Sequence, residues 1–386
     1  MSSLETFAAA SGAIEISFLT QIGPDPLNPN PERDAQIAAV ATKIADFING
    51  AKATLDLAIY DFRLHDAPAA VLTAAIRAAA QRGVAVRIAY DAATSGGSVD
   101  APGPALPDPQ RDHAEAKTPG ADNFVGTFKD VAQIKPIKAY QALMHNKYII
   151  RDGASSEAAV FMGTANFTND SWGLQENNIL TLRSQPLSTY YTVDFNDLWV
   201  RGKIADSTGY HDTGTVTIGD TEVTVVFTPG ESKAVVKEIV GVIAGAKSSL
   251  AVASVVLSSA PILAALSEAL DRGVPFSGIY DGPQMDQVIR QWQAAGIGAD
   301  RIAAWQKISK AMARKDSIPF SAANPGQPHN FMHNKLVVAD DCVVTGSFNL
   351  SHHAMMNAEN TLLIRNSAIA ERYRAYLAKI VAMYRK

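Results

Sequence analysis

The chain has 386 residues, of which 47% are hydrophobic and 19% charged, a balance typical of a folded globular protein, so we do not expect disorder. The net charge is −4, so the chain lacks the excess of basic residues that most nucleic-acid binders have. A local basic groove would still be compatible with this charge. Cys342 is the only cysteine, so no intramolecular disulfide can form, and we expect a buried, unreactive side chain.

The chain shows no secretory or membrane-spanning signal. Its N-terminus lacks the basic start and apolar core of a signal peptide. The most apolar run, residues 249–270, contains Pro261 and Glu268, which argues against a membrane span. We therefore predict a cytoplasmic protein, with a mature secreted chain as the alternative.

The first half alternates predicted strands and helices. Residues 14–19 alternate like a strand, and the proline-rich segment 23–31 predicts a loop. Apolar residues then recur at helical spacing over 37–48. A strand over 55–60, a helix over 67–81 and a strand over 84–91 complete a βαβ pattern, which favours parallel pairing.

The second half repeats this order, with a strand over 223–227, a helix over 234–244 and a strand over 250–256. Arg82-Gly83-Val84 recurs as Arg272-Gly273-Val274, and Tyr90-Asp91 recurs as Tyr280-Asp281 at the same offset. The sequence therefore predicts a duplication, with lobes at residues 1–205 and 206–386 and a linker near 204–214.

Two long segments separate these units from the motifs described next. Residues 91–123 are rich in Gly, Pro and Asp and predict a long loop. Residues 286–304 have helical periodicity, and 307–315 are locally basic. Because long loops that lead to a catalytic strand commonly shape substrate access, we expect these segments to determine specificity.

One sequence pattern occurs twice. Met-His-Asn-Lys stands at 144–147 and at 332–335, each time followed by an apolar run and an aspartate. Gly-Ser/Thr-x-Asn follows at 163–166 and 346–349, and then Glu-Asn at 176–177 and 359–360. The glutamate follows the motif asparagine by ten residues in both copies. Two copies of one pattern indicate a single site shared by two lobes.

This doubled His-x-Lys-x4-Asp pattern resembles the phospholipase D superfamily of phosphodiesterases, over nearly the whole chain. The resemblance implies an α/β fold in which two similar lobes, each a mixed sheet flanked by helices, are related by a pseudo-twofold axis. It also implies an enzyme that needs no cofactor, metal or obligate protein partner, and we expect a monomer.

The motif histidines and lysines have the arrangement that phosphodiester chemistry requires. Alternate residues of a strand share a face, so His145 lies beside Lys147, and His333 beside Lys335. One imidazole can attack phosphorus while the other protonates the leaving oxygen, and the lysines neutralise the non-bridging oxygens. The resemblance makes His145 the nucleophile and His333 the acid, although the near-symmetry of the copies leaves their order open.

Asparagines and glutamates complete each predicted set. Asn166 and Asn349 would donate hydrogen bonds to the same phosphate oxygens. By the resemblance, Glu176 and Glu359 hold the second nitrogen of each imidazole and fix its tautomer.

The remaining motif residues have less direct predicted roles. Asp152 and Asp340 lie on the opposite strand parity from the lysines, so we expect structural ion pairs rather than proton transfer. Thr164 and Ser347 either contact substrate or, as we prefer, cap their turns.

Three further residues invite a functional interpretation. Trp172 could line the substrate entrance or pack in the core. His352 could contact substrate at the rim or lie in a solvated loop. His329 precedes His333 by four residues, but the glutamate of a zinc-protease helix is absent, so we expect no zinc site.

The C-terminal helix, 369–384, is predicted to pack on the sheet, with peripheral membrane contact as the alternative.

The substrate class rests on charge. The acidic balance, without a Lys/Arg-rich stretch with interleaved aromatic residues, favours a phospholipid over nucleic acid. A nuclease cutting DNA or RNA is the alternative hypothesis. A non-catalytic phosphate-binding scaffold is a third, which the retention of His and Lys in both halves argues against.

Overall fold

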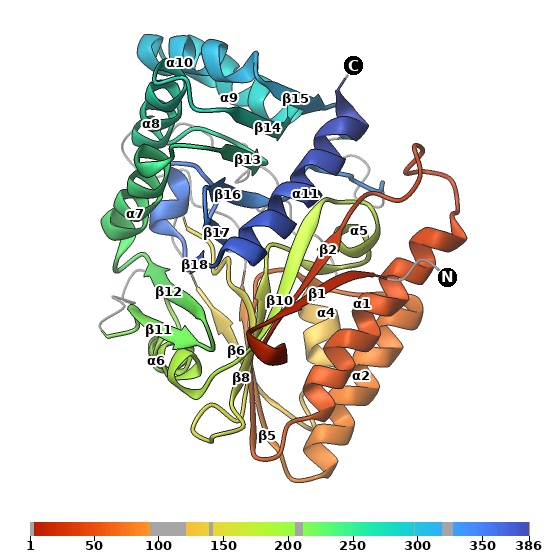
Figure 1. Ribbon diagram of the computed structural model, residues 1–386. Helices are drawn as coiled ribbons and strands as arrows, with labels where there is room; N and C mark the ends of the chain where they lie inside the picture. The colour runs from red at the N-terminus through yellow and green to blue at the C-terminus, as the bar shows by residue number, and fades with distance from the viewer. Residues whose placement is uncertain are drawn as a thin grey trace.

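The computed structural model describes residues 4–92, 121–138, 142–204, 211–296, 298–318 and 327–385. Its framework is two eight-stranded mixed sheets that lie against each other (Figure 1). Most of the predicted specificity segment 91–123 and the predicted lobe boundary at residues 205 and 206 lie outside the described residues.

The N-terminal sheet comes from the first half of the chain. Its strand order is β1 (Glu5–Ala9), β2 (Ile14–Leu19), β10 (Asn177–Arg183), β8 (Ala159–Gly163), β7 (Lys147–Arg151), β3 (Thr54–Ile59), β5 (Ala85–Asp91) and β6 (Gln133–Ile137). β3, β5 and β6 pair in parallel and the other neighbours pair antiparallel.

The C-terminal sheet repeats this order. It runs β11 (Gly214–Ile218), β12 (Thr221–Thr228), β18 (Glu359–Arg365), β17 (Cys342–Gly346), β16 (Lys335–Ala339), β13 (Leu250–Ser254), β14 (Phe276–Asp281) and β15 (Met312–Lys315). The duplication and the mixed α/β fold predicted from the sequence are therefore confirmed. A two-stranded parallel ribbon, β4 (Phe62–Arg63) with β9 (Phe167–Thr168), stands apart from both sheets.

Helices cover the outer faces of the sheets and fill the space between them (Figure 1). α1 (Pro31–Asn49) and α2 (Asp66–Gln81) pack on the N-terminal sheet, and α7 (Ser232–Gly245) and α8 (Ala260–Asp271) pack on the C-terminal sheet. α6 (Gln185–Arg201) and α11 (Ser367–Tyr384) share one apolar core with both sheets. The remaining helices are α4 (Ala121–Gly126), α5 (Asn169–Gly173), α9 (Gly282–Ala294) and α10 (Ala299–Ser309), with 3₁₀ turns η1 (Ala10–Gly12) and η2 (His353–Met356).

Most of the predicted elements are present, with some differences. The helical pattern over 286–304 forms two helices, α9 and α10, because Gly296 and Gly298 adopt positive φ between them. The basic run over 307–315 ends in β15, an edge strand that periodicity did not reveal because it is only four residues long. The C-terminal helix packs on the sheet, as predicted.

Candidate active site

The two motif histidines lie two residues before two central strands, β7 and β16, which begin at the motif lysines. Register places both strands alike, since Ile59 of β3 pairs with Lys147 and Ser254 of β13 pairs with Lys335. The halves also meet directly here, because the amide of His145 donates to the carbonyl of Ala358, 2.9 Å away. Both imidazoles are buried at this junction.

Each imidazole is held by a residue from the other half of the chain. Nδ1 of His145 lies 2.7 Å from Oε2 of Glu359, and Nδ1 of His333 lies 3.0 Å from Oδ1 of Asn177. The side-chain amide of Asn177 donates to the carbonyl of Ser171, which leaves its Oδ1 to accept from His333. Nε2 of each ring is therefore the nitrogen available for chemistry.

The partner of His333 is not the glutamate that the sequence pattern indicated. Gly163 pairs with Ile179 and Gly346 pairs with Thr361, so Asn177 is the structural counterpart of Glu359. The first copy has one extra residue between its motif asparagine and this position, where it forms α5 and the second copy forms η2. The equal sequence spacing therefore matched Glu359 with Glu176, which is one residue before its true counterpart, Asn177.

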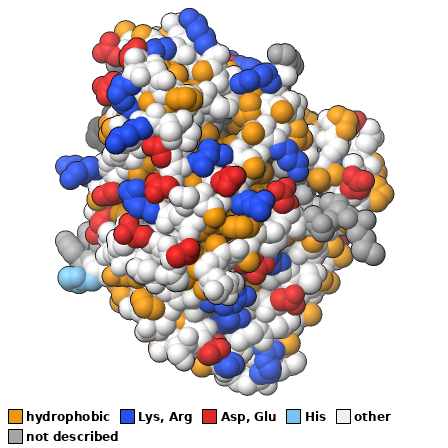
Figure 2. All heavy atoms as spheres, in the orientation of Figure 1, with side chains coloured by type: hydrophobic (Ala, Val, Ile, Leu, Met, Phe, Trp, Pro, Cys, Tyr) orange, Lys and Arg blue, Asp and Glu red, His pale blue; other side chains and the backbone are white. Residues whose placement is uncertain are grey.

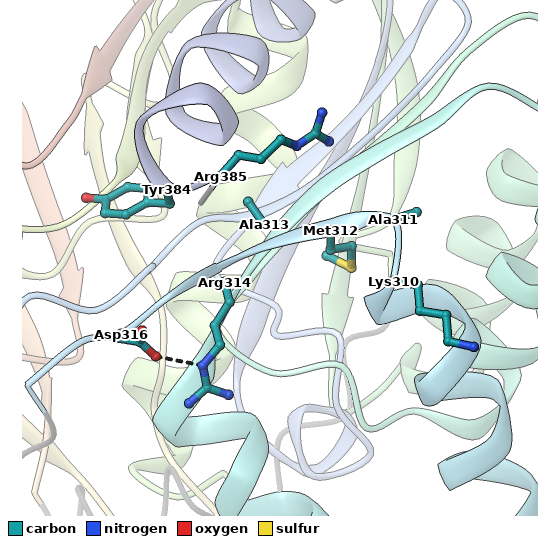
Figure 3. A pocket seen from close by; sticks show the side chains of 8 residues that line it. All are labelled: Lys310, Ala311, Met312, Ala313, Arg314, Asp316, Tyr384 and Arg385. Carbon is teal, nitrogen blue, oxygen red and sulfur yellow. Dashed lines mark hydrogen bonds and ion pairs between the residues drawn. The ribbon is translucent and has the colours of Figure 1, made fainter.

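Glu176 instead joins a buried ion pair between the halves. Its carboxylate accepts from Nζ of Lys315 at 2.6 Å and from the hydroxyl of Tyr384 at 2.6 Å. Figure 3 shows Tyr384, at the end of α11, beside the edge strand β15 that carries Lys315, in a surface pocket that Arg314 and Arg385 also line. The predicted role of Glu176 as an imidazole partner is therefore not supported by the geometry.

The motif lysines are buried beside the histidines. Nζ of Lys147 donates to the carbonyl of His145 at 2.7 Å, and Nζ of Lys335 donates to that of His333 at 2.8 Å. Burial lowers the pKa of Lys147 to about 7. Burial and the neighbouring Lys147 ammonium lower the pKa of Lys335 well below its usual value. A bound phosphodiester anion would restore both positive charges.

Burial also shifts the pKa values of both histidines and of Glu359. It lowers the pKa values of His145 and His333 well below the usual value, and the nearby lysines act in the same direction. It raises the pKa of Glu359 to about 7. Burial thus favours the neutral form of both imidazoles, whereas a bound phosphodiester anion would favour the imidazolium of His333.

Hydroxyl groups support the two imidazole partners. Oγ1 of Thr164 donates to Oδ1 of Asn177 at 2.8 Å, and Ser347 hydrogen-bonds to Glu359. Each hydroxyl also accepts a backbone amide, from Asn178 and Asn360 respectively. Thr164 and Ser347 thus position the imidazole partners, an arrangement beyond the turn-capping role that the sequence suggested.

The motif asparagines lie near the ends of β8 and β17, after the glycines. Asn349 is fully buried, and Asn166 is half-buried. Oδ1 of Asn166 has no hydrogen-bond partner in the described part of the chain. A predicted contact of their amides with a phosphate stays a prediction.

Asp152 and Asp340 lie at the far ends of β7 and β16, away from the histidines. Asp152 accepts the amides of Lys52, Ala53 and Thr54. Asp340 likewise accepts the amides at 247–249 and the hydroxyl of Ser248. Both carboxylates bind backbone amides rather than forming the ion pairs we expected.

Two predicted substrate-binding residues lie elsewhere. Trp172 is 1% exposed and packs edge-to-face on Phe167, so it belongs to the core rather than to an entrance. His352 is exposed and precedes η2, and no substrate role follows from its position.

Sequence reasoning missed several residues around the histidines. The ring of Tyr60 contacts His145 with centroids 4.7 Å apart, and Nζ of Lys147 lies 4.9 Å from the same ring. Asp91 and Asp281 accept the amides that precede the two histidines, at 2.8 and 2.9 Å. The repeated Tyr-Asp pair was a signal for these aspartates, whereas no pattern marked Tyr60.

The site thus combines two His-Lys pairs on a duplicated α/β fold, with each imidazole held from the other half of the chain. The profile of the family described as "Cardiolipin synthase, PLD-like domain" matches residues 44–199 and 239–381. The chain therefore belongs to this family of the phospholipase D superfamily.

Solved structures share the fold. Phosphatidylserine synthase of Haemophilus influenzae Rd KW20 aligns with a TM-score of 0.62 at 13% identity, over 98% of this chain and 88% of that one. Polyphosphate kinase of Porphyromonas gingivalis aligns with a TM-score of 0.52 at 10% identity, over 90% of this chain and 48% of that one. Nuc of Salmonella typhimurium, a phospholipase D family member, is 24% identical over 42% of this chain and 93% of its own, with a TM-score of 0.30. A search of curated proteins found no match.

Proposed function

We propose that this protein is a phosphodiesterase of phospholipase D type that cleaves a phospholipid and passes its phosphatidyl group to water or to an alcohol. The crossed pairing of two buried imidazoles, His145 with Glu359 and His333 with Asn177, carries the proposal. The family description and the name of the Haemophilus relative both concern phospholipid synthesis, which supports a phospholipid substrate.

The proposed reaction has two steps, both in line at phosphorus. Nε2 of His145 attacks phosphorus, the bond to the head-group oxygen breaks, and His333 gives its Nε2 proton to that oxygen. His333 then takes a proton from water or an alcohol, whose oxygen attacks phosphorus and displaces His145. Lys147 and Lys335 hold the non-bridging oxygens throughout.

The unequal partners support His145 as the nucleophile. An imidazole that bonds to phosphorus through Nε2 becomes cationic, and the carboxylate of Glu359 on Nδ1 stabilises that charge. His333 faces the neutral amide of Asn177, so its imidazolium is stabilised less and gives up its proton more readily.

The order of the histidines can be tested with a substrate whose leaving group needs no acid. With phosphatidyl-p-nitrophenol, we expect His333→Ala to release one equivalent of nitrophenol and to accumulate a phosphoenzyme, whereas His145→Ala releases none. The opposite result would exchange the two roles.

The substrate class also has a direct test. Figure 2 shows Lys and Arg interspersed with Asp and Glu over the visible face, which does not resemble a track for a polyanion. We expect the protein, in EDTA, to convert phosphatidylcholine and ethanol to choline and phosphatidylethanol with little salt dependence. Efficient cutting of single-stranded DNA, with neither choline nor phosphatidylethanol formed, would instead establish the nuclease alternative.

A further inference from the structure

A cleft of about 820 Å³ lies mainly in the N-terminal half of the chain. α1 forms one wall, the first turn of α2 and the loop before α1 form others, and residues 327–329 from the C-terminal half close one end. Its size is that of pockets that bury most of a small ligand.

The β4–β9 ribbon connects this cleft to the catalytic residues. Arg63 pairs with Thr168 in the ribbon, and both line the cleft. Each strand follows directly from the site, since Tyr60 contacts His145 shortly before β4 and Asn166 immediately precedes β9. At the other end of the cleft, His329 lies four residues before His333 in the chain.

The lining of the cleft is mixed, and its apolar part includes a stripe on α1 that is flanked by Arg33, Asp34 and Thr42. Ile37, Ala38 and Ala41 recur at helical spacing on the lining face of α1, and Leu27 and Val71 face them from the loop and from α2. Leu27 is 58% exposed and Val71 is 37% exposed, so the cleft leaves large apolar side chains uncovered. Hydrophobic side chains also gather on the right-hand projection in Figure 2, where Figure 1 places the loop before α1.

The charges of the cleft do not suit a nucleic acid or a second phosphate. The guanidinium of Arg33 donates to four backbone carbonyls of residues 22–28, and Arg63 is paired with Asp61. Asp34, Asp66 and Asp170 also line the cleft, and none of the described residues that line it is Phe, Tyr or Trp, on which bases would stack.

We propose that this cleft binds an acyl chain of the phospholipid whose phosphate lies between His145 and His333. The inference rests on the proposed function, and it assigns the lipid tail to the N-terminal half. The head group then leaves from the other side of the phosphorus, so the cleft remains occupied by the phosphatidyl group through both steps.

Chain-length dependence tests this assignment. With monomeric dibutyroyl and dihexanoyl phosphatidylcholine, each methylene buried in the cleft raises kcat/KM by up to about fourfold, so we expect on the order of tenfold between the two lipids. Ala38→Trp should fill the cleft and reduce this ratio to near one. Ala35→Trp, on an exposed position of α1 outside the cleft, is the matched control and should keep the wild-type ratio.

Turnover of bis(p-nitrophenyl) phosphate, which has no acyl chain, separates folding from binding and should be unchanged in both variants. If Ala38→Trp loses this turnover, Val71→Trp fills the cleft from the opposite wall. Phosphatidylcholine turnover with the chain-length ratio intact in the filled variants would overturn the cleft assignment alone. Diester turnover without any phosphatidylcholine cleavage would overturn the proposed function and the cleft assignment together.

Discussion

At the scale of single residues, the two glutamates of the repeated Glu-Asn pair provide a matched comparison. Glu359 holds His145, whereas Glu176 contacts Lys315 and Tyr384. We expect Glu359→Gln to lower kcat/KM by roughly 10²–10⁴-fold, because the neutral amide does not stabilise the cationic imidazole. Glu176→Gln should retain turnover at temperatures where it is folded. Equal losses in the two variants would contradict the structural alignment of Asn177 with Glu359.

The pH dependence of the free protein should also report on Glu359 and Lys147. Burial raises the pKa of Glu359 to about 7, so activity should rise as pH increases and the carboxylate forms. Burial lowers the pKa of Lys147 to about 7, so activity should fall as pH increases further and the ammonium is lost. A profile of kcat/KM should therefore be bell-shaped around neutral pH, and Glu359→Gln should remove its acidic limb. A flat profile between pH 5 and 9 would argue against both assignments.

The sequence identified the site residues that belong to a local, repeated sequence pattern. His145, Lys147, His333 and Lys335 were found because the same short pattern occurs twice in the sequence. Asn177 was not found, because its role depends on a one-residue difference between α5 and η2 that only strand register reveals.

At the scale of elements, the two motif aspartates fix the turns that enter the central strands β3 and β13. Both adopt positive φ, 53° for Asp152 and 49° for Asp340, and each carboxylate collects amides from the turn opposite. Sequence predicted the strands well but not these partners, because a backbone amide about 90 to 100 residues away leaves no side-chain signature.

Asp340→Asn should therefore cost stability rather than chemistry. Charge-assisted hydrogen bonds to amides suggest a loss of about 1–3 kcal/mol in the free energy of unfolding, measured in urea. Burial raises the pKa of Asp340, but its hydrogen bonds outweigh this effect and lower the pKa to about 2. The carboxylate therefore stabilises the fold fully above the pKa that it has in the unfolded chain. This stabilisation disappears as pH falls toward 2. Asp341→Asn, at the exposed neighbouring position, is the control. A loss of kcat in Asp340→Asn at constant stability would return this residue to the catalytic group.

At the scale of the whole molecule, the two halves are joined by more than the active site. One apolar core contains residues of both sheets together with α6 and α11. Phe18 of β2 stacks on Tyr376 of α11, and the hydroxyl of Tyr376 donates to the carbonyl of Leu19. Because each half buries its sheet against the other, a cut between the lobes would expose this shared core. The duplication was visible in the sequence, whereas the contacts between its copies were not.

Substitutions in the ion pair of Glu176 with Lys315 would test the contact between the two halves most directly. Both side chains are buried, they come from opposite halves, and Lys315 also lies 5.1 Å from the ring of Tyr384. Removing one partner of a buried pair commonly costs about 3–5 kcal/mol, because the remaining group is left buried without compensation. We expect Lys315→Met to lower the free energy of unfolding by an amount in this range and the double variant Lys315→Met/Glu176→Gln to recover part of it. Since the core is shared, fluorescence and circular dichroism should follow one coincident urea transition in each variant. Two separated transitions would mean that the halves are stable independently. Additive losses in the double variant would mean that Glu176 and Lys315 do not stabilise each other.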